Sequence, residues 1–358
     1  MKKIRIGIIG CGGIANNKHM PSLHKIEDVE MVAFCDMIEE KATKAAAEYG
    51  IDGAKVFTDY KQLLDLDLDA VHVCTPNNSH SEISVAALKA GCHVMCEKPM
   101  AKTTEGAKAM VKAAKETQKI LTIGYQNRFR EDSKYLKKVC KNNELGDVYF
   151  AKAHAVRRRA VPTWGVFLKE EEQGGGPLID IGTHALDLTL WCMDNYEPLK
   201  VSGSVYHKMR YDLEPGNAFG DWNPDEFTVE DSAFGFITMK NGATIILESS
   251  WALNTLEIGE AKTTLCGTKA GADMQDGLRI NGAKYNKLYV TKPGLDAGGV
   301  DFYDGASDDP AYAEAKSFIN CIKNGTSPVV KPEQAFVVTE ILEAIYESAK
   351  TGKEIFFK

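Results

Sequence analysis

The chain has 358 residues, more than one ordinary hydrophobic core needs, and this length fits two domains. Hydrophobic residues make up 44% and charged residues 26%, the balance of a globular protein, and the net charge of -7 argues against nucleic acid or an anionic membrane as partner. The nine cysteines are scattered without a Cys-x-x-Cys pair, so we expect free thiols, no metal site and a cytoplasmic location. The first apolar run is short and soon meets glycine, which predicts neither a signal peptide nor a membrane span.

The first third of the chain alternates short apolar runs with helical patterns. Six runs are predicted to be strands: Ile4–Ile9, Val29–Cys35, Val56–Phe57, Ala70–Cys74, His93–Met95 and Ile120–Ile123. Strands that alternate with helices in this way indicate a parallel, doubly wound sheet with right-handed crossovers. We therefore predict an α/β domain built on this sheet over residues 1–124.

The pattern changes after residue 124, because from residue 201 on strands follow one another without intervening helices. The predicted strands of this part are Asp147–Val156, Val201–His207, Ser232–Met239, Ala243–Trp251 and Ala261–Cys266. Asn241-Gly242 is a two-residue hairpin signal, and the whole pattern predicts a mostly antiparallel α+β domain over residues 125–358. Helices are expected at Ile179–Met193, Pro310–Lys323 and Pro332–Lys350, of which the last is a candidate to pack back on the first domain. Arg157–Gly176 is expected to be a loop, and Asn281–Gly305 has no assignment beyond loop and short strand.

A glycine-rich motif follows the first predicted strand directly. It fits G-x-G-x-x-A, in which the glycines permit a tight turn and let the backbone approach a pyrophosphate at a helix amino end. Asp36 ends the second strand 21 residues after Ala15, where an acid binds the adenosine ribose. This acid favours NAD, although Lys41 and Lys44 keep NADP possible. The predicted cofactor residues of this part are Gly10, Gly12, Gly13, Ile14 and Asp36.

Two further strand ends carry polar residues. The fourth strand ends in Cys74-Thr-Pro-Asn-Asn-Ser-His80, and the fifth ends in Glu97-Lys98-Pro99. Ligands collect at the carboxyl ends of parallel strands, so Lys98 is placed to present its ammonium group to a nicotinamide and a substrate hydroxyl. An exposed charged turn is an equally good interpretation of Glu97-Lys98 from spacing alone.

The second domain contains Asp180 and His184, four residues apart in a predicted helix. This spacing puts them one turn apart on one helix face, where a carboxylate makes the histidine a ready proton acceptor. For an isolated Asp-x-x-x-His, a buried histidine that caps its own helix is the better interpretation.

These segments, taken in order, resemble the glucose–fructose oxidoreductase / inositol dehydrogenase (Gfo/Idh/MocA) family. The resemblance is carried by Gly-Cys-Gly-Gly-Ile-Ala, Cys-Thr-Pro-Asn-Asn-Ser-His, Glu-Lys-Pro and Gly-Gly-Gly-Pro-Leu-Ile-Asp-Ile-Gly-Thr-His. It implies a dinucleotide-binding Rossmann domain followed by a mostly antiparallel α+β domain whose open sheet face forms homodimers or homotetramers. It further implies a catalytic set of Lys98, Asp180 and His184. It also implies further cofactor contacts from Thr75, Pro76, Asn77, His80, Glu97, Lys98 and Asn127.

The resemblance implies reversible, NAD-dependent oxidation of a secondary hydroxyl on a sugar or cyclitol. His184 is expected to accept the hydroxyl proton, Asp180 to orient His184, and Lys98 to hydrogen-bond the developing alkoxide. Arg128 is a further substrate candidate, and Trp164 is expected to stack on a sugar face unless it serves packing. An NAD-retaining glycoside hydrolase uses the same residues and stays open, while a non-catalytic NAD-binding regulator fits the intact catalytic set less well. The sugar, the carbon and the reaction direction are not predicted.

Overall fold

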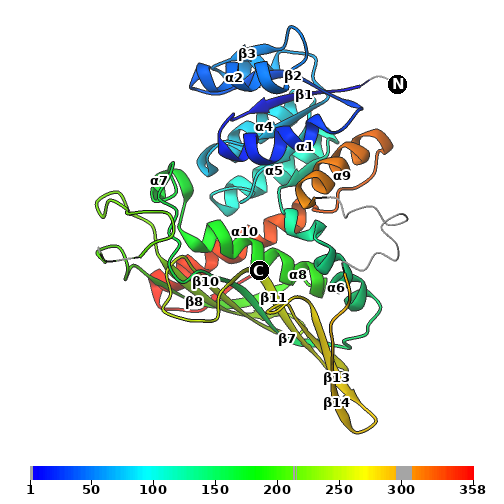
Figure 1. Ribbon diagram of the computed structural model, residues 1–358, viewed down its shortest axis with the longest axis vertical. Helices are drawn as coiled ribbons and strands as arrows, with labels where there is room; N and C mark the ends of the chain where they lie inside the picture. Colours follow the sequence, from blue (N-terminus) through cyan, green and yellow to red (C-terminus); the bar gives the residue numbers. More distant parts are fainter. Residues whose placement is uncertain (1–2, 213, 215, 296–308) are drawn as a thin grey trace. The chain divides into compact units, whose positions relative to one another are not determined.

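The computed structural model describes residues 3–212, 214, 216–295 and 309–358 (Figure 1). The chain divides into two compact units, each of which is built from two segments. Unit 1 comprises Met1–Phe129 and Asp308–Phe336, and unit 2 comprises Arg130–Ser307 and Val337–Lys358.

Unit 1 contains the predicted parallel sheet. Its six strands run in the order β3-β2-β1-β4-β5-β6, and every neighbouring pair is parallel. The strand order reverses between β1 and β4, which is the point where doubly wound sheets bind ligands at the carboxyl ends of their strands. The strands are β1 Ile4–Ile9, β2 Val29–Cys35, β3 Lys55–Phe57, β4 Ala70–Val73, β5 His93–Cys96 and β6 Leu121–Ile123.

Helices flank this sheet, and side chains cap three of them: Asp59 accepts from Lys61 N at α3, Thr103 from Gly106 N at α5, and Asp309 from Ala311 N at α9. The helical segments of unit 1 are η1 Ala15–His19, α1 Met20–His24, α2 Glu39–Tyr49, α3 Tyr60–Leu64, η2 Asn77–Ser79, α4 His80–Lys89, α5 Thr104–Thr117, η3 Gln126–Phe129, α9 Pro310–Asn324 and the start of α10 Pro332–Thr351.

Helix α9 belongs to unit 1, although it lies about two hundred residues downstream of the sheet in sequence. Its buried Phe318 and Ile319 share one hydrophobic core with Ile6 of β1, Met20 of α1 and Phe34 of β2. The predicted domain of residues 1–124 is therefore incomplete, because the segment Asp308–Phe336 completes its core.

Unit 2 is built on a nine-stranded sheet with the order β14-β13-β12-β11-β7-β10-β9-β8-β15. Only the β7–β10 pair is parallel, and the other neighbouring pairs are antiparallel, as the predicted fold class requires. Its elements are α6 Glu131–Lys141, β7 Val148–Val156, α7 Glu170–Gln173, η4 Leu178–Gly182, α8 Thr183–Met193, β8 Pro198–Tyr206, β9 Ser232–Met239, β10 Thr244–Ser250, β11 Gly259–Gly267, β12 Ala270–Asp273, β13 Arg279–Lys284, β14 Lys287–Thr291, β15 Ile355–Phe356 and the later part of α10.

The β9–β10 hairpin is confirmed, but its loop differs from the predicted two-residue turn. Met239 N donates to Ala243 O, so three residues, 240–242, form the loop. Gly242 has φ of +88°, the left-handed conformation that closes a three-residue hairpin. The β13–β14 hairpin occupies part of the unassigned segment Asn281–Gly305, of which residues 296–305 lie outside the described residues.

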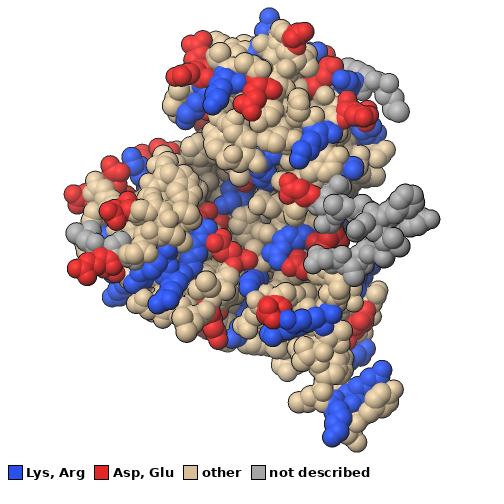
Figure 2. All heavy atoms as spheres, viewed as in Figure 1, with Lys and Arg blue, Asp and Glu red and all other residues tan. Residues whose placement is uncertain are grey.

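In the described part of the chain, no helix combines the length and apolar character needed to cross a bilayer. Figure 2 shows lysine and arginine side chains interspersed with aspartate and glutamate on the face in view. All nine cysteines are free thiols.

Candidate active site

The glycine-rich loop after β1 is held in a tight turn by its own backbone. Gly10 has φ of +89°, and a Cβ atom there would lie 2.7 Å from the carbonyl carbon of Cys74. Only glycine fits this position, as the motif predicts. The side-chain amide of Asn16 donates to Cys11 O and Gly12 O, both at 2.8 Å, and so holds the loop in place.

The second glycine of the motif has a different role from the first. A Cβ atom at Gly12 would meet nothing within 4 Å, and at Gly13 it would only approach the end of the Asn17 side chain at 4.0 Å. Packing within the protein therefore does not demand glycine here, and open space lies above the loop. The adjoining Ile14 is 41% exposed. Such a surface fits a dinucleotide pyrophosphate, which needs close approach to the backbone.

Asp36, directly after β2, connects the glycine loop to the next turn. Its Oδ2 accepts from Cys11 N and its Oδ1 from Ile38 N, both at 2.9 Å. Each carboxylate oxygen can accept a second hydrogen bond, so this geometry fits the expected ribose contact.

The segments after β4 and β5 are fastened to each other by His80. Its Nδ1 lies 2.7 Å from Pro99 O, its Nε2 lies 2.9 Å from Thr75 O, and the side chain is fully buried. Burial lowers the pKa of His80, and both contacts to carbonyl oxygens oppose that shift. The His80 side chain thus joins these two loops and is not exposed to a ligand. Of the other predicted contacts here, Asn77 is nearly buried, Pro76 is exposed and Thr75 Oγ1 accepts from Ser79 Oγ at 2.7 Å.

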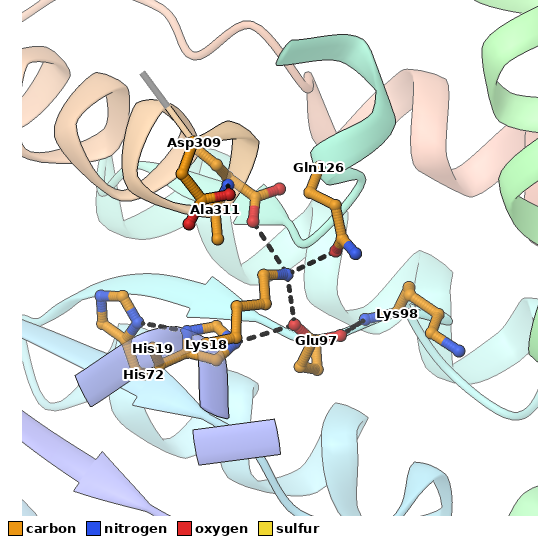
Figure 3. Close-up of polar contacts among 9 residues, drawn as sticks. Lys18, His19, His72, Glu97, Lys98, Gln126, Asp309 and Ala311 are labelled. Carbon is orange, nitrogen blue, oxygen red and sulfur yellow. Dashed lines mark hydrogen bonds and ion pairs between the residues drawn. The ribbon is translucent and has the colours of Figure 1, made fainter. Parts of the chain in front are cut away.

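Glu97 and Lys98 differ sharply in environment. Glu97 is 4% exposed, whereas Lys98 is half-buried. Burial opposes ionisation of Glu97, but the nearby Lys18 and His19 hold its pKa well below the ordinary value. The Oε2 atom of Glu97 accepts the main-chain N–H of Lys98 at 3.1 Å (Figure 3). Glu97 is therefore buried and supports the main chain of Lys98. Neither of the two interpretations of Glu97-Lys98 from the sequence predicted this role.

Arg128, a predicted substrate residue, is 1% exposed. Its Nη1 donates to Val329 O at 3.0 Å and to Gln334 Oε1 at 2.7 Å. The guanidinium thus joins η3 to Val329 and to the first turn of α10 within unit 1. Because it is buried there, Arg128 does not face a substrate, contrary to the prediction. Asn127 lies beside it in η3 and is half-buried.

In unit 2, Gly174 has φ of +80° at the end of α7, and close packing explains Gly175 and Gly176. A Cβ atom would lie 2.0 Å from Tyr346 Oη at Gly175 and 2.2 Å from Glu230 O at Gly176. The buried Glu230 accepts from Gly176 N at 2.7 Å, Leu178 N at 3.1 Å and Tyr346 Oη at 2.8 Å. Burial raises the pKa of Glu230 despite these donors. Sequence reasoning missed Glu230, whose only local signal is its position before a predicted strand.

The helix predicted at Ile179–Met193 is present, but it begins with a π-helical turn. Asp180 lies in η4 and His184 lies in the first turn of α8, and both are half-buried. Trp251, fully buried, donates its indole N–H to Asp180 Oδ2 at 3.0 Å. Burial lowers the pKa of Arg157, but the hydrogen bond and charge of Glu260 outweigh burial and raise it. The charge of Asp180 adds to this rise, so Arg157 lies near Asp180. π-Helical turns occur frequently at functional sites.

Trp164, the predicted sugar-stacking residue, is 51% exposed. Its ring makes edge-on contacts with Phe219 at 4.8 Å and with Phe167 at 5.7 Å between centroids. Asn217 joins the loop of Phe219 to the loop of Trp164, because its side chain accepts from Val161 N at 2.8 Å and donates to Val161 O at 3.0 Å. The exposed part of the indole is therefore held in place by both loops.

The predicted residues are distributed over both units. The cofactor candidates and Lys98 lie in unit 1, whereas Trp164, Asp180 and His184 lie in unit 2. Among the described residues, no group of three or more histidine, cysteine, aspartate or glutamate side chains could hold a metal ion.

Known protein families match the sequence of both units. Residues 4–125 match the family described as "Oxidoreductase family, NAD-binding Rossmann fold", and residues 133–273 match the "GFO/IDH/MocA C-terminal domain". The chain belongs to the Gfo/Idh/MocA family. The resemblance inferred from the motifs is thus confirmed, and unit 1 contains an NAD-binding Rossmann domain.

Similarity to individual members of the Gfo/Idh/MocA family extends over nearly the whole chain. The chain is 36% identical to a D-glucoside 3-dehydrogenase of Escherichia coli, over 98% of this chain and 97% of the relative. It is 28% identical to a myo-inositol 2-dehydrogenase of Thermotoga maritima, over 92% and 91%. A levoglucosan dehydrogenase solved with NADH has the same fold, with a TM-score of 0.82 and 21% identity over both full chains. The chain is therefore an NAD-binding oxidoreductase of a family that includes sugar and cyclitol dehydrogenases.

Proposed function

We propose that the protein is an NAD-dependent dehydrogenase that oxidises the C3 hydroxyl of a glucoside to a ketone. The observation that carries this proposal is the 36% identity to a D-glucoside 3-dehydrogenase over 98% of the chain, in both units. NAD is favoured over NADP because the Asp36 carboxylate would repel a 2′-phosphate.

Gly10, Gly12, Gly13 and Asp36 would hold the cofactor, which supplies a hydride acceptor when bound. In the proposed reaction the carbinol carbon loses a hydride to NAD⁺ and its hydroxyl loses a proton, which leaves a ketone. His184 accepts that proton, since imidazole accepts protons near neutral pH. Asp180 orients His184 and balances the charge that it gains.

Lys98 donates a hydrogen bond to the hydroxyl oxygen as negative charge develops on it. A preorganised donor of this kind contributes a few kcal/mol to transition-state stabilisation, about 3 kcal/mol for one donor. Trp164 offers its exposed face to the apolar face of a pyranose ring. The alternative packing role is less favoured, because half of the indole stays exposed although two rings hold it.

The activity is tested by incubating the purified chain with NAD⁺ and a panel of methyl glucosides, free sugars and inositols, with absorbance at 340 nm as readout. We expect NADH formation with the glucosides and a 3-keto product by NMR. Release of nitrophenol from a nitrophenyl glucoside without net NADH would replace this proposal with the glycoside hydrolase. Tight NADH binding without turnover on any compound would replace it with the regulator.

We also infer that the open face of the unit 2 sheet binds a second copy of the chain. Ala233, Gly235 and Ile237 of β9 are buried on one face, whereas Phe236 on the opposite face is 51% exposed and Tyr206 of β8 is 41% exposed. Light scattering after gel filtration should give a dimer or tetramer that Phe236→Lys weakens. A monomer at all accessible concentrations would contradict this inference.

A further inference from the structure

A buried ionic cluster in unit 1 lies next to the proposed catalytic Lys98. We call it the Lys18 cluster, and its members are Lys18, His19, His72, Glu97, Gln126 and Glu314 (Figure 3). The charged side chains are almost completely enclosed: Lys18 is 6% exposed, Glu97 4% and Glu314 3%. Ionic groups this deeply buried are costly unless they are fully paired.

The ammonium group of Lys18 has three donors, and three acceptors surround it. They are Glu97 Oε1 at 2.6 Å, Gln126 Oε1 at 2.7 Å and Glu314 Oε2 at 2.9 Å. Burial alone would lower the pKa of Lys18, but the charges of Glu314 and Glu97 outweigh it and raise that pKa. Lys18 therefore remains a cation fixed from three sides.

Glu97 passes this constraint on to Lys98. Its Oε1 receives Lys18 and also His19 Nε2 at 2.8 Å, so its other oxygen, Oε2, is aimed at the main-chain N–H of Lys98. The tautomer of His19 follows from this contact: Nε2 carries the proton toward the carboxylate, so Nδ1 accepts from His72 Nδ1 at 2.8 Å. The carboxylate is thus held by two donors that are themselves buried and paired.

The cluster forms a chain of contacts, Glu314–Lys18–Glu97–Lys98, across three elements of the fold. Helix α9 supplies Glu314, the glycine-loop helix η1 supplies Lys18, and the end of β5 supplies Glu97. We propose that Lys18 and Glu314 are positioning residues, which hold Glu97 and thereby fix the backbone from which the Lys98 side chain departs. This inference rests on the proposed role of Lys98 in catalysis.

A purely structural role for the cluster makes a different prediction, and a double-mutant cycle separates the two. Glu314→Gln removes one charge but keeps an oxygen that can accept from Lys18. If Glu314 acts through Lys98, we expect Glu314→Gln to lower kcat about tenfold in the wild-type background, as small misplacements of catalytic groups do. In a Lys98→Ala background the same change should leave the residual kcat unaltered, and within each background Glu314→Gln should leave the Kd for NADH unchanged.

Thermal denaturation of the four proteins provides the second readout. The loss of stability caused by Glu314→Gln should be the same in the wild-type and Lys98→Ala backgrounds. The matched control is Glu333→Gln, which removes a carboxylate from the exposed Lys115–Glu333 pair of the same unit and should leave kcat unchanged. Lys18→Met is the companion variant, and its effect on kcat should also disappear without Lys98.

The outcomes distinguish failure of this inference from failure of the proposed function. If Lys98→Ala retains wild-type kcat on glucosides, the proposed role of Lys98 is wrong and the inference falls with it. If Lys98→Ala is impaired but Glu314→Gln leaves kcat unchanged, or lowers it equally in both backgrounds, only the positioning role is overturned.

Discussion

Trp251 donates its indole N–H to Asp180 across two elements of unit 2, from the end of β10 to the π-helical turn η4. The indole is fully buried, so this donor cannot be replaced by bulk water. The contact fixes the carboxylate that is proposed to orient His184.

Replacing Trp251 with Phe should therefore reduce turnover more than cofactor binding. A hydrogen bond to a charged acceptor is worth about 1.5–3 kcal/mol, so we expect kcat to fall by about 10- to 150-fold with an unchanged Kd for NADH. Trp222→Phe is the matched control, because the indole of Trp222 donates instead to Arg210 O at 2.8 Å. Equal kcat losses in the two variants would mean that Trp251 serves only the core.

The two glycines of the phosphate loop should respond differently to alanine. Gly10→Ala forces a side chain into a left-handed backbone and against Cys74, so the protein should lose stability. Gly12→Ala meets no protein atom, so its Tm should be that of the wild type while NADH affinity falls. Thermal denaturation and fluorescence titration with NADH check both variants. Unchanged NADH affinity in Gly12→Ala would show that the pyrophosphate does not approach this position.

Asp36→Ala should weaken NAD⁺ binding and reduce the preference for NAD⁺ over NADP⁺. The ribose loses its acceptor and the 2′-phosphate loses a repelling charge. Asp59→Ala is a close control: Asp59 also follows a strand and accepts a main-chain N–H, but it caps α3. This control should cost about 1 kcal/mol of stability without a change in cofactor preference. Steady-state kinetics with both cofactors measures the ratio, and an unaltered ratio in Asp36→Ala would refute the assignment.

The buried histidines make the fold sensitive to mild acid. Burial lowers the pKa of His19, His72 and His80 below the ordinary value of 6.5. The unfolded chain then binds protons first, so the free energy of unfolding is retained above pH 6.5 and falls as the pH drops below it. Each such histidine contributes at most about 1.4 kcal/mol per pH unit.

Urea denaturation of the wild type and His72→Phe between pH 7.5 and 5.5 tests this dependence. The pKa of His72 is lowered furthest of these three, first by burial and then by His19 and Lys18, so its removal should reduce the slope. The raised pKa of Glu230 acts in the opposite direction in both proteins and cancels in the comparison. His24→Gln, an exposed site, is the control. Identical slopes for wild type and His72→Phe would contradict the account.

Local patterns in the sequence predicted the parallel sheet of unit 1 and most strands of unit 2, because alternation and glycine placement are properties of neighbouring residues. The same patterns could not show that α9 completes unit 1, or that Glu314 reaches Lys18, since these contacts join residues far apart in the chain. The π-helical turn at Asp180 was missed because its i→i+5 hydrogen bonds extend over only five residues, too few to change the apolar pattern of the helix.

The burial of Arg128 and His80 was also beyond the sequence. Polar residues at a strand end or a domain entrance look like ligand contacts, but here they contact main-chain oxygens and close the core. The role of Glu97 beneath Lys98 could not be predicted for the same reason. The buried Glu97 is paired with Lys18 and His19, which lie far from it in the sequence, in η1.

The most direct measurement is isotope transfer from a methyl glucoside that carries deuterium at C3. Mass spectrometry of the reduced cofactor after incubation with this glucoside and NAD⁺ follows the migrating atom itself. The account predicts that the wild type yields deuterated NADH and that His184→Ala binds NADH but yields none. Unlabelled NADH from the deuterated glucoside, or wild-type turnover in His184→Ala, would contradict it.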